Sequence, residues 1–318
     1  MVHGKTSRVS KAMLERVNAI IEDLGYVPNM PARALASRSS KVVAMVNHLD
    51  PAVSGNFMED PFHTAFIGAV ETAMRESNYY LMLRSVGSSA DLREFLGNWN
   101  VDGLFLTGVF EDEDLYEALR GLRVPVVLCD SYLSDYSRVV NVGLQDYEGG
   151  RLATEHLLQN GHRQIAFVGP PINHAGVVEQ RLLGYRSALA AAGVPFAPSR
   201  LFECEFSPGK TIRLGLELAA RDDITAIFCT ADILAAGIIA GIQQAGKRVP
   251  EDFSLVGFDD IGWCRMLNPQ LTTVHQDAAK KGETAAKCMV TLLEGGEVPE
   301  RNIILPVNLI SRASVCAI

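Results

Sequence analysis

Residues 249–277, VPEDFSLVGFDDIGWCRMLNPQLTTVHQD, contain the pattern that decides the fold class. Residues 253–258 are a short apolar run of strand type, and two carboxylates, Asp259 and Asp260, follow it directly. In an open parallel sheet, ligands bind beyond the carboxyl ends of the strands, so this position is a candidate binding site. Asp260 can also be read as the N-cap of a short helix that follows. The local pattern leaves both interpretations of Asp260 open.

The rest of the chain alternates between strand-like and helical patterns from residue 42 onward. The strand-like runs are 42–48, 79–84, 102–106, 125–129, 164–168, 225–229, 253–258 and a last one at 304–314. The helical patterns are 63–76, 89–98, 112–120, 146–159, 178–192, 210–220 and 231–245. This alternation favours an α/β architecture with parallel sheets that helices cover on both faces. Although the first seven of these strands could form one sheet, the helix at 146–159 marks a midpoint, and we expect two sub-domains with a cleft between them.

The composition is that of a soluble globular protein. The chain has 318 residues, 48% of them hydrophobic and 21% charged, which suits two or three domains of ordinary size. It contains no apolar run that could cross a bilayer, and its basic start lacks the apolar segment of a secretory signal. The six cysteines are scattered singly, without metal-ligand spacing. We therefore expect a cytoplasmic protein that contacts no membrane and needs no metal or other cofactor.

The charges are distributed unevenly between the start of the chain and the remainder. Residues 1–41 carry seven Lys or Arg and three acids, a net charge of +4, and the other 277 residues carry −12. Within this basic segment, residues 10–24 form an amphipathic helical pattern, and residues 31–37 form a second, shorter one before a linker that ends at residue 41. The asymmetry suggests that the basic segment meets a polyanion, although seven cations can also be ordinary surface charge.

Several segments, taken in order, resemble the lactose-repressor/galactose-repressor (LacI/GalR) family of bacterial transcription regulators. They are LERVNAIIEDLGYVPN (14–29), ARALAS (32–37), GGRLATEHLLQNGHRQIAFVGP (149–170), QRLLGYRSALAAAG (180–193), VPEDFSLVGFDD (249–260) and NPQLTTVHQD (268–277). The resemblance implies a core like a type I periplasmic binding protein, joined by a hinge helix to a helix-turn-helix head. It also implies a homodimer that binds operator DNA under the control of a small-molecule effector.

The resemblance also implies the domain boundaries. Residues 1–30 would be a remnant of the head, residues 31–41 the hinge helix and linker, and residues 42–318 the effector-binding core. Because the chain of such a core crosses between its halves three times, each half is discontinuous. The first sub-domain would comprise about 42–160 and 277–305, and the second about 161–275 and 307–318.

One departure from the family concerns the head. Only nine residues precede the helix at 10–24, too few for the family's first two helices, so this chain is expected to lack major-groove base readout. Three explanations fit this short head: a misplaced start codon, a chain that was cut, or a protein that has lost base readout. Arg33, Leu35 and Ser37 match hinge positions that meet DNA, Leu35 as a minor-groove wedge. In a chain without a complete head, however, Leu35 is expected to pack on that head or to be disordered.

The family's effector-binding positions can be carried over residue by residue. The matching residues are Asp60, Phe62, Arg181, Phe206, Asp232, Asp259 and Gln276. Arg181 and Asp259 suit a ligand rich in hydroxyl groups, since one donates a paired fork of hydrogen bonds and the other accepts them. Read without the family, Arg181 is a helix-surface residue, and Phe206 is equally well explained by core packing.

Some departures change what the cleft can recognise. The connection at 47–62 is longer than usual, and the common Asp-Asn before the Gly-Gly pair is Gln145-Asp146 here. Ala231-Asp232 replaces the usual Asn-Asp, which removes an amide near the effector. His63 is more typical of a helix start and His162 of a structural turn than of a ligand contact.

Enzyme classes find no support in the sequence. It has no dinucleotide-binding glycine motif, no phosphate-binding loop and no nucleophile elbow, so we assign no catalytic residue. We expect a transcription regulator, acting as a repressor, whose core binds a sugar or similar polar effector. The alternative is a sugar-binding protein of the same fold that does not bind DNA. The sequence leaves open the effector, its sense as inducer or corepressor, the operator, and dimer against tetramer.

Overall fold

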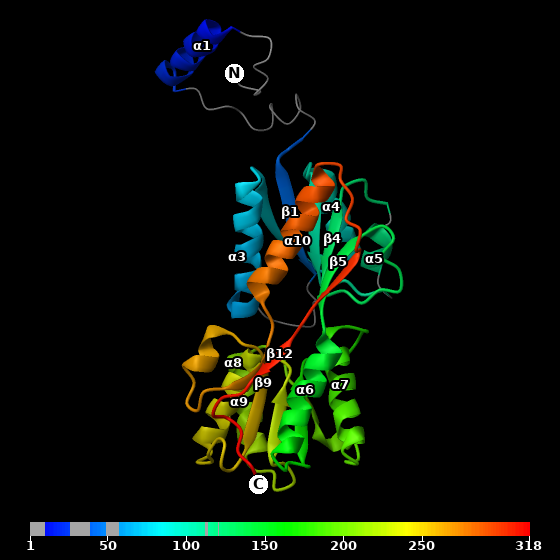
Figure 1. The fold of residues 1–318 in the computed structure, drawn as a ribbon, viewed down its shortest axis with the longest axis vertical. Coiled ribbons are helices and arrows are strands. Elements are labelled where there is room, and N and C mark those ends of the chain that lie inside the picture. The colour runs from blue at the N-terminus through cyan, green and yellow to red at the C-terminus, as the bar shows by residue number, and fades with distance from the viewer. Residues whose placement is uncertain (1–9, 26–38, 49–56, 112–113, 120) are drawn as a thin grey trace.

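The computed structural model describes residues 10–25, 39–48, 57–111, 114–119 and 121–318. The core contains two six-stranded sheets, stacked along the long axis of the molecule (Figure 1). We refer to each sheet with its covering helices as the first and the second sub-domain. The expected architecture of two doubly wound α/β units is confirmed.

The first sheet is entirely parallel, with the strand order β11-β5-β4-β3-β1-β2. Its strands are β1 (Val42–His48), β2 (Tyr80–Val86), β3 (Gly103–Thr107), β4 (Val126–Cys129), β5 (Val140–Leu144) and β11 (Asn302–Leu305). Its helices are α3 (Pro61–Glu76), α4 (Ser89–Asn98), α5 (Asp114–Leu119) and α10 (Ala278–Leu293), with a short 3-10 turn η1 (Phe57–Glu59) before α3.

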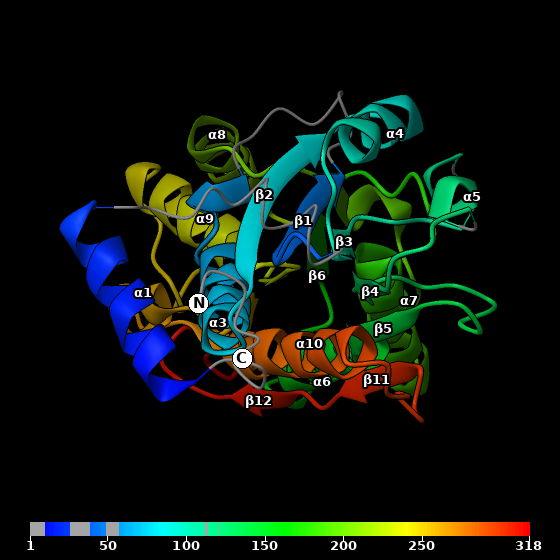
Figure 2. The same cartoon turned by 90° about the horizontal axis from the view of Figure 1, so that it is seen from above.

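Both faces of this sheet are buried because side chains alternate along each strand. Met45 and Phe105 face α3 and α10, whereas Val46 and Leu104 face α4 and α5. Figure 2 shows these two helix pairs on opposite sides of the strands. Each fully buried Phe or Leu contributes about 1.5–3 kcal/mol relative to exposure, so the near-continuous apolar runs are what two covered faces require.

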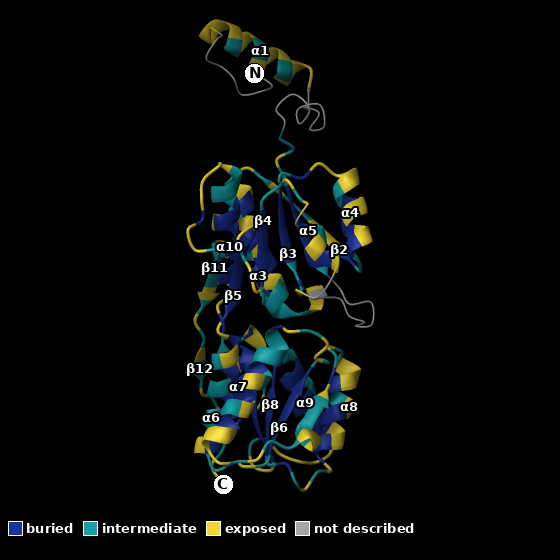
Figure 3. Cartoon of the chain, turned by 90° about the vertical axis from the view of Figure 1, so that its right-hand side faces the viewer, coloured by how far each residue is buried: buried dark blue, intermediate teal, exposed yellow. Residues whose placement is uncertain are grey.

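The second sheet has the order β12-β10-β9-β8-β6-β7, in which only β12 is antiparallel to its neighbour. Its strands are β6 (Ile165–Gly169), β7 (Leu201–Glu203), β8 (Ala226–Cys229), β9 (Ser254–Asp259), β10 (Thr272–His275) and β12 (Asn308–Ile310). Helices α6 (Asp146–Gln159) and α7 (Val177–Ala191) cover one face, and α8 (Pro208–Leu218) and α9 (Asp232–Gln244) the other. Two 3-10 turns are η2 (Pro198–Arg200) and η3 (Gly262–Arg265). The central strands of both sheets are deeply buried, whereas the edge strands β2, β7, β11 and β12 are partly exposed (Figure 3).

The chain passes between the sub-domains three times. The passages run from β5 to α6, from β10 to α10 and from β11 to β12 (Figure 1). All three lie on the side occupied by β11 and β12 in Figure 3. Two of them bring a strand of one sub-domain directly to a helix of the other, so a rotation between the sub-domains moves these helix starts.

Helix α1 (Lys11–Asp23) lies beyond the end of the first sub-domain that faces away from the second (Figure 1). Ser10 caps it by accepting from the Met13 amide at 3.3 Å. None of its residues is buried, and Ile20 and Leu24 on its apolar face are 48% and 72% exposed. The hinge residues Arg33, Leu35 and Ser37, and the helix expected at 31–37, lie outside the described residues.

Several expectations about individual elements were wrong. Strands β5, β7 and β10 are absent from the sequence-based assignment. The single strand expected at 304–314 is two short strands in different sheets, with Pro306 between them, because proline has no N–H to continue a ladder. The expected boundary near residue 160 assigned α6 to the first sub-domain, but its buried Ala153 and Leu157 pack against the second sheet.

Candidate effector-binding site

Strand β9 ends at two residues whose backbone is in the left-handed region. The φ angles are 116° at Asp259 and 59° at Asp260, which L-residues with a Cβ adopt only when the surroundings hold them there. Asp260 is held by Arg312 and by His275 Nδ1 at 3.1 Å, and Asp259 accepts from Gln276 Nε2 at 2.5 Å. The N-cap of η3 is Ile261, so the reading of Asp260 as a cap is wrong and its role is to support the turn.

Asp232, at the start of α9, also holds the turn that follows β9. Its carboxylate accepts from the Ile261 amide at 3.0 Å, the Cys264 thiol at 3.0 Å and the Thr273 hydroxyl at 2.6 Å. The residue is 1% exposed, and burial raises the pKa of this carboxyl to about 7 against the opposing hydrogen bonds. Asp232 therefore ties together the segment after β9, and the expectation that it contacts the effector is not supported by its position.

Glycines set the close approach of α6 and α7 that positions the buried cation of the site. A Cβ at Gly150 would lie 2.1 Å from the Arg181 carbonyl oxygen, and one at Gly184 would lie 2.0 Å from the Tyr147 carbonyl oxygen. Only glycine fits at these contacts. They bring the N-terminus of α6, with Asp146, against Arg181 on α7.

Arg181 forms a buried ion pair with Asp146. Its Nε and Nη2 each lie 2.8 Å from Asp146 Oδ1, its Nη1 donates to the Thr230 carbonyl, and its guanidinium lies 3.5 Å from the ring centre of Phe258. Burial opposes the charge of Arg181, but the Asp146 and Asp259 carboxylates raise its pKa, so it is a cation. Burial raises the pKa of Asp146, an effect that Arg181 counteracts.

A second buried cation, Lys281, lies in the first turn of α10. Its Nζ donates to both oxygens of Asp130, at 2.8 and 2.9 Å, and to Gln276 Oε1 at 3.0 Å. Because Gln276 also donates to Asp259, a polar chain runs from Asp130 at the end of β4 to Asp259 at the end of β9. Tyr132 adds a second link by donating to Asp146 Oδ2 at 2.6 Å. The two sub-domains are thus joined by hydrogen bonds where the chain crosses between them.

A cavity of about 220 Å³ lies at this junction. The first sub-domain contributes the start of α3, the second contributes the turn after β9, and the segment from β10 to α10 closes it. The residues that line it are Pro61, Phe62, Ala65, Asp259, Asp260, Ile261, Gly262, His275, Gln276, Asp277 and Ala278. Burial raises the pKa of Asp259 well above its usual value, and Arg181 counteracts part of that rise.

The structure brings together most, but not all, of the residues predicted from the sequence. Phe62, Asp259 and Gln276 line the cavity. Asp60 caps α3 beside it by accepting from the Phe62 amide, and it acts electrostatically on Asp259. Arg181 lies behind Asp259, with its fork already occupied.

Phe206, like Asp60, Arg181 and Asp232, does not line the cavity. It lies between β7 and α8 and is 36% exposed. Both readings given for it from the sequence, a ring stacked on the ligand and a core residue, therefore lack support.

Sequence reasoning missed Asp130, Tyr132 and Lys281, which belong to this network. Asp130 follows the apolar run at 125–129 just as Asp259 follows its own strand, and that shared pattern could have identified it. Lys281 gave no such signal because a lysine on an amphipathic helix is normally exposed.

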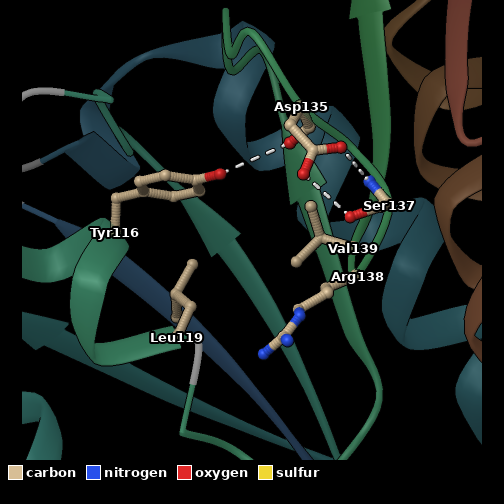
Figure 4. A pocket seen from close by; sticks show the side chains of 6 residues that line it. All are labelled: Tyr116, Leu119, Asp135, Ser137, Arg138 and Val139. Atoms are coloured by element: carbon tan, nitrogen blue, oxygen red, sulfur yellow. Dashed lines mark hydrogen bonds between the residues drawn. The ribbon is translucent and has the colours of Figure 1, made fainter.

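A larger hollow of about 320 Å³ lies on the first sub-domain, away from the junction. It is lined by Tyr116, Leu119, Asp135, Ser137, Arg138 and Val139 (Figure 4). Its hydrogen bonds join lining residues to each other: Tyr116 donates to the Asp135 carbonyl, and Ser137 binds the Asp135 carboxylate. These contacts stabilise the loop before β5.

Within the described residues, no group of three or more His, Cys, Asp or Glu is arranged to hold a metal ion. Among the helices that the structure describes, none is long and apolar enough to span a membrane.

The fold and the cavity define the ligand-binding core of a periplasmic-binding-protein-like protein. A family model for a periplasmic binding protein-like domain matches residues 154–315. The chain is 31% identical to the HTH-type transcriptional regulator CelR of Thermobifida fusca, over 97% of this chain and 91% of that protein. It is 30% identical to the HTH-type transcriptional repressor PurR of Aliivibrio salmonicida, over 99% and 93%.

Solved structures agree with these relatives. The CelR–cellobiose complex has a TM-score of 0.77 at 29% identity, covering 97% of this chain and 92% of that one. A LacI family regulator from Enterococcus faecium with bound ribose has a TM-score of 0.74 at 27% identity, covering 87% and 99%. The chain belongs to the LacI/GalR family and is a ligand-responsive transcription regulator. Membership agrees with the sequence-based expectations of a non-enzymatic, cytoplasmic protein.

Proposed function

We propose that the effector of this regulator is a sugar or similar small polar molecule, bound in the cavity between the sub-domains. The observation that carries the proposal is the position of Asp259, at the carboxyl end of β9 and in the cavity wall. A carboxyl group there can accept hydrogen bonds from ligand hydroxyls, and Phe62 contributes an aromatic ring to the same cavity wall. The solved structure of CelR, which is 29% identical to this protein over 97% of the chain, is a complex with cellobiose.

Effector binding would act on the relative position of the sub-domains. The cavity wall includes the passage from β10 to α10, and Gln276 in that passage contacts both Asp259 and Lys281. A ligand that prefers one arrangement of the sub-domains shifts the population toward it by its difference in affinity. The start of α10 would then move with the ligand, and the signal would reach the first sub-domain.

We also propose that the working unit is a homodimer that binds operator DNA through the segment before residue 42. Large apolar side chains are exposed on both sub-domains: Tyr80 and Leu83 on β2, Trp263 and Met266 at η3. Apolar surface of this kind is typical of protein–protein interfaces. The net charge of +4 on residues 1–41, with Arg33, Leu35 and Ser37 at the hinge positions, suits contact with DNA.

A thermal-shift screen against sugars, sugar phosphates and nucleosides tests the effector half. A ligand that binds only the folded protein raises the melting temperature, by an amount set by its concentration relative to Kd. We expect a sugar to do so for the wild type and for Asp223→Asn, a control outside the cavity, but not for Asp259→Ala. Equal shifts in all three proteins would contradict the site.

The DNA half needs a separate measurement. Binding to the promoter region of the protein's own gene, with and without the ligand from the screen, should differ if the ligand controls the operator complex. A protein that binds the sugar but shows no DNA binding at low salt would instead support a sugar-binding protein without operator activity.

A further inference from the structure

We propose that the cavity accepts uncharged, polyhydroxylated ligands and rejects anionic ones such as sugar phosphates and sugar acids. This inference rests on the proposed function, because it concerns the ligand of the same cavity. It follows from how the charges around the cavity are paired rather than from any single residue.

The cavity wall itself carries acids but no strong base. Asp259, Asp260 and Asp277 line it, and the residues of the wall include neither lysine nor arginine. His275 is the one basic side chain in the wall, and it contacts Asp260. An anion entering the cavity would therefore meet carboxylates without a facing cation.

The cations that lie nearby are already neutralised. Arg181 is paired with Asp146, Lys281 with Asp130, and Arg312 with Asp260. Arg181 and Lys281 are 6% and 1% exposed, so both cations depend on their carboxylate partners rather than on solvent. A phosphate could recruit Arg181 only by displacing the buried carboxylate of Asp146, and Lys281 only by displacing the partly buried carboxylate of Asp130.

The helix N-termini that adjoin the cavity are occupied as well. An N-terminus is a common phosphate site because its first N–H groups are free. Here Asp60 accepts from the Phe62 amide at the start of α3, and Asp277 accepts from the Lys280 amide at the start of α10. Each cap places a negative charge where an anionic ligand would have to bind.

The same arrangement suits hydroxyl donors. Asp259 is held by Gln276 through Oδ1 alone, so within the described part of the chain its Oδ2 is left to accept from a ligand. Burial raises the pKa of this carboxyl well above its usual value, and Arg181 counteracts part of that rise. A neutral ligand can therefore exchange hydrogen bonds with the wall without introducing charge.

The test measures Kd by calorimetry for matched pairs of compounds that differ only in charge. Cellobiose, maltose, sucrose, glucose and ribose are each compared with a phosphate ester, and glucose also with glucuronate. We expect at least one neutral sugar to bind and its charged counterpart to bind at least a hundredfold more weakly. A phosphate or uronate that binds as tightly as its neutral parent overturns the inference but leaves the proposed function intact. If nothing on the panel binds, the proposed function fails, and this inference with it.

Two charge variants sharpen the test. Asp130→Asn releases Lys281 from its pair, and Asp60→Asn removes a charge beside Asp259 while the asparagine can still cap α3. Each should lower the preference for the neutral over the anionic compound at least tenfold, whereas the control Asp223→Asn, outside the cavity, should leave it unchanged. A preference that is the same in all four proteins means that these charges do not set ligand selection. If Asp130→Asn does not fold, the preference measured for Asp60→Asn alone decides whether these charges set ligand selection.

Discussion

On the second sub-domain's side of the cavity, Asp259 and Asp260 are fixed by hydrogen bonds and ion pairs that reach back to Asp232 and Arg312. The first sub-domain's side, by contrast, consists of Pro61, Phe62 and Ala65 at the start of α3 and Ala278 at the start of α10, which offer shape and one aromatic ring. The polar wall is therefore preorganised for recognition, whereas the apolar side chains of the other wall form no hydrogen bonds of their own that would fix their distance to the ligand. We infer that specificity resides in the second sub-domain and closure in the first.

The largest effect is expected from removing the cation behind the polar wall. Arg181→Ala leaves Asp146 buried and without its partner, which typically costs about 3–5 kcal/mol of unfolding free energy. Chemical denaturation should show this loss. Arg186→Ala on the same helix removes only an exposed cation near Phe196 and should cost less than about 1 kcal/mol. Equal losses in both variants would mean that the buried pair has no special role.

The second prediction breaks the helix contact that positions this wall. In Gly184→Ala the new methyl group would overlap the Tyr147 carbonyl oxygen, and we expect a loss of about 1–3 kcal/mol measured by denaturation. Gly97→Ala in α4 meets no atom within 4 Å, so it should be neutral or stabilise by up to about 1 kcal/mol. A tolerated Gly184→Ala would show that α6 and α7 can separate freely.

Asp232 makes the polar wall sensitive to pH. Its carboxyl has a pKa of about 7 in the folded protein against 3.8 when unfolded, so the folded state binds the extra proton between these values. Stability from this group is full below pH 3.8 and is lost as pH rises through 7. The loss between pH 5.5 and 7 should be roughly 2 kcal/mol.

Asp232→Asn removes this titration, and denaturation curves of the two proteins across pH 5.5–8.5 provide the measurement. The stability of the wild type relative to the variant should fall up to about pH 7 and then level off. A constant difference across the range would show that Asp232 keeps its proton, or loses it, in both states.

The smallest effect concerns a contact across the cleft. Phe110, after β3, stacks on His174, before α7, with ring centres 4.7 Å apart and planes at 15°. Such pairs contribute about 0.5–1.5 kcal/mol. If the effector favours the arrangement in which this stack joins the sub-domains, Phe110→Ala should weaken effector binding by roughly three- to tenfold. Phe110→Tyr keeps the stack and should bind as the wild type does. Affinity that is equally unchanged in both would exclude a role in closure.

The sequence predicted the architecture well because long covered strands and amphipathic helices leave strong periodic patterns. It failed at β7 and β10, which are only three and four residues long, and at β5, where the run at 140–144 went unrecognised as a strand. It failed again at 304–314, because no local pattern shows that two short strands join different sheets. Short elements gain their structure from neighbours that are distant in the chain.

The residues of the candidate site also fall into those that the sequence could predict and those that it could not. Asp259 and Gln276 could be predicted, since strand ends and family motifs identify them. The roles of Asp232 and Lys281 could not, because they depend on which buried donors and acceptors meet in three dimensions. Both the sequence pattern and the structure put Asp232 at the start of a helix. Only the structure shows that Ile261, Cys264 and Thr273 surround its carboxylate.

The division of labour between the two walls is tested most directly by calorimetric titration of one neutral sugar from the screen into three proteins: the wild type, Asp259→Ala and Phe62→Ala. We predict that Asp259→Ala weakens binding at least a hundredfold, equivalent to roughly 2.7 kcal/mol, because the polar wall carries recognition. Phe62→Ala should weaken it by no more than about tenfold. A larger loss in Phe62→Ala than in Asp259→Ala would contradict the assignment of specificity to the second sub-domain.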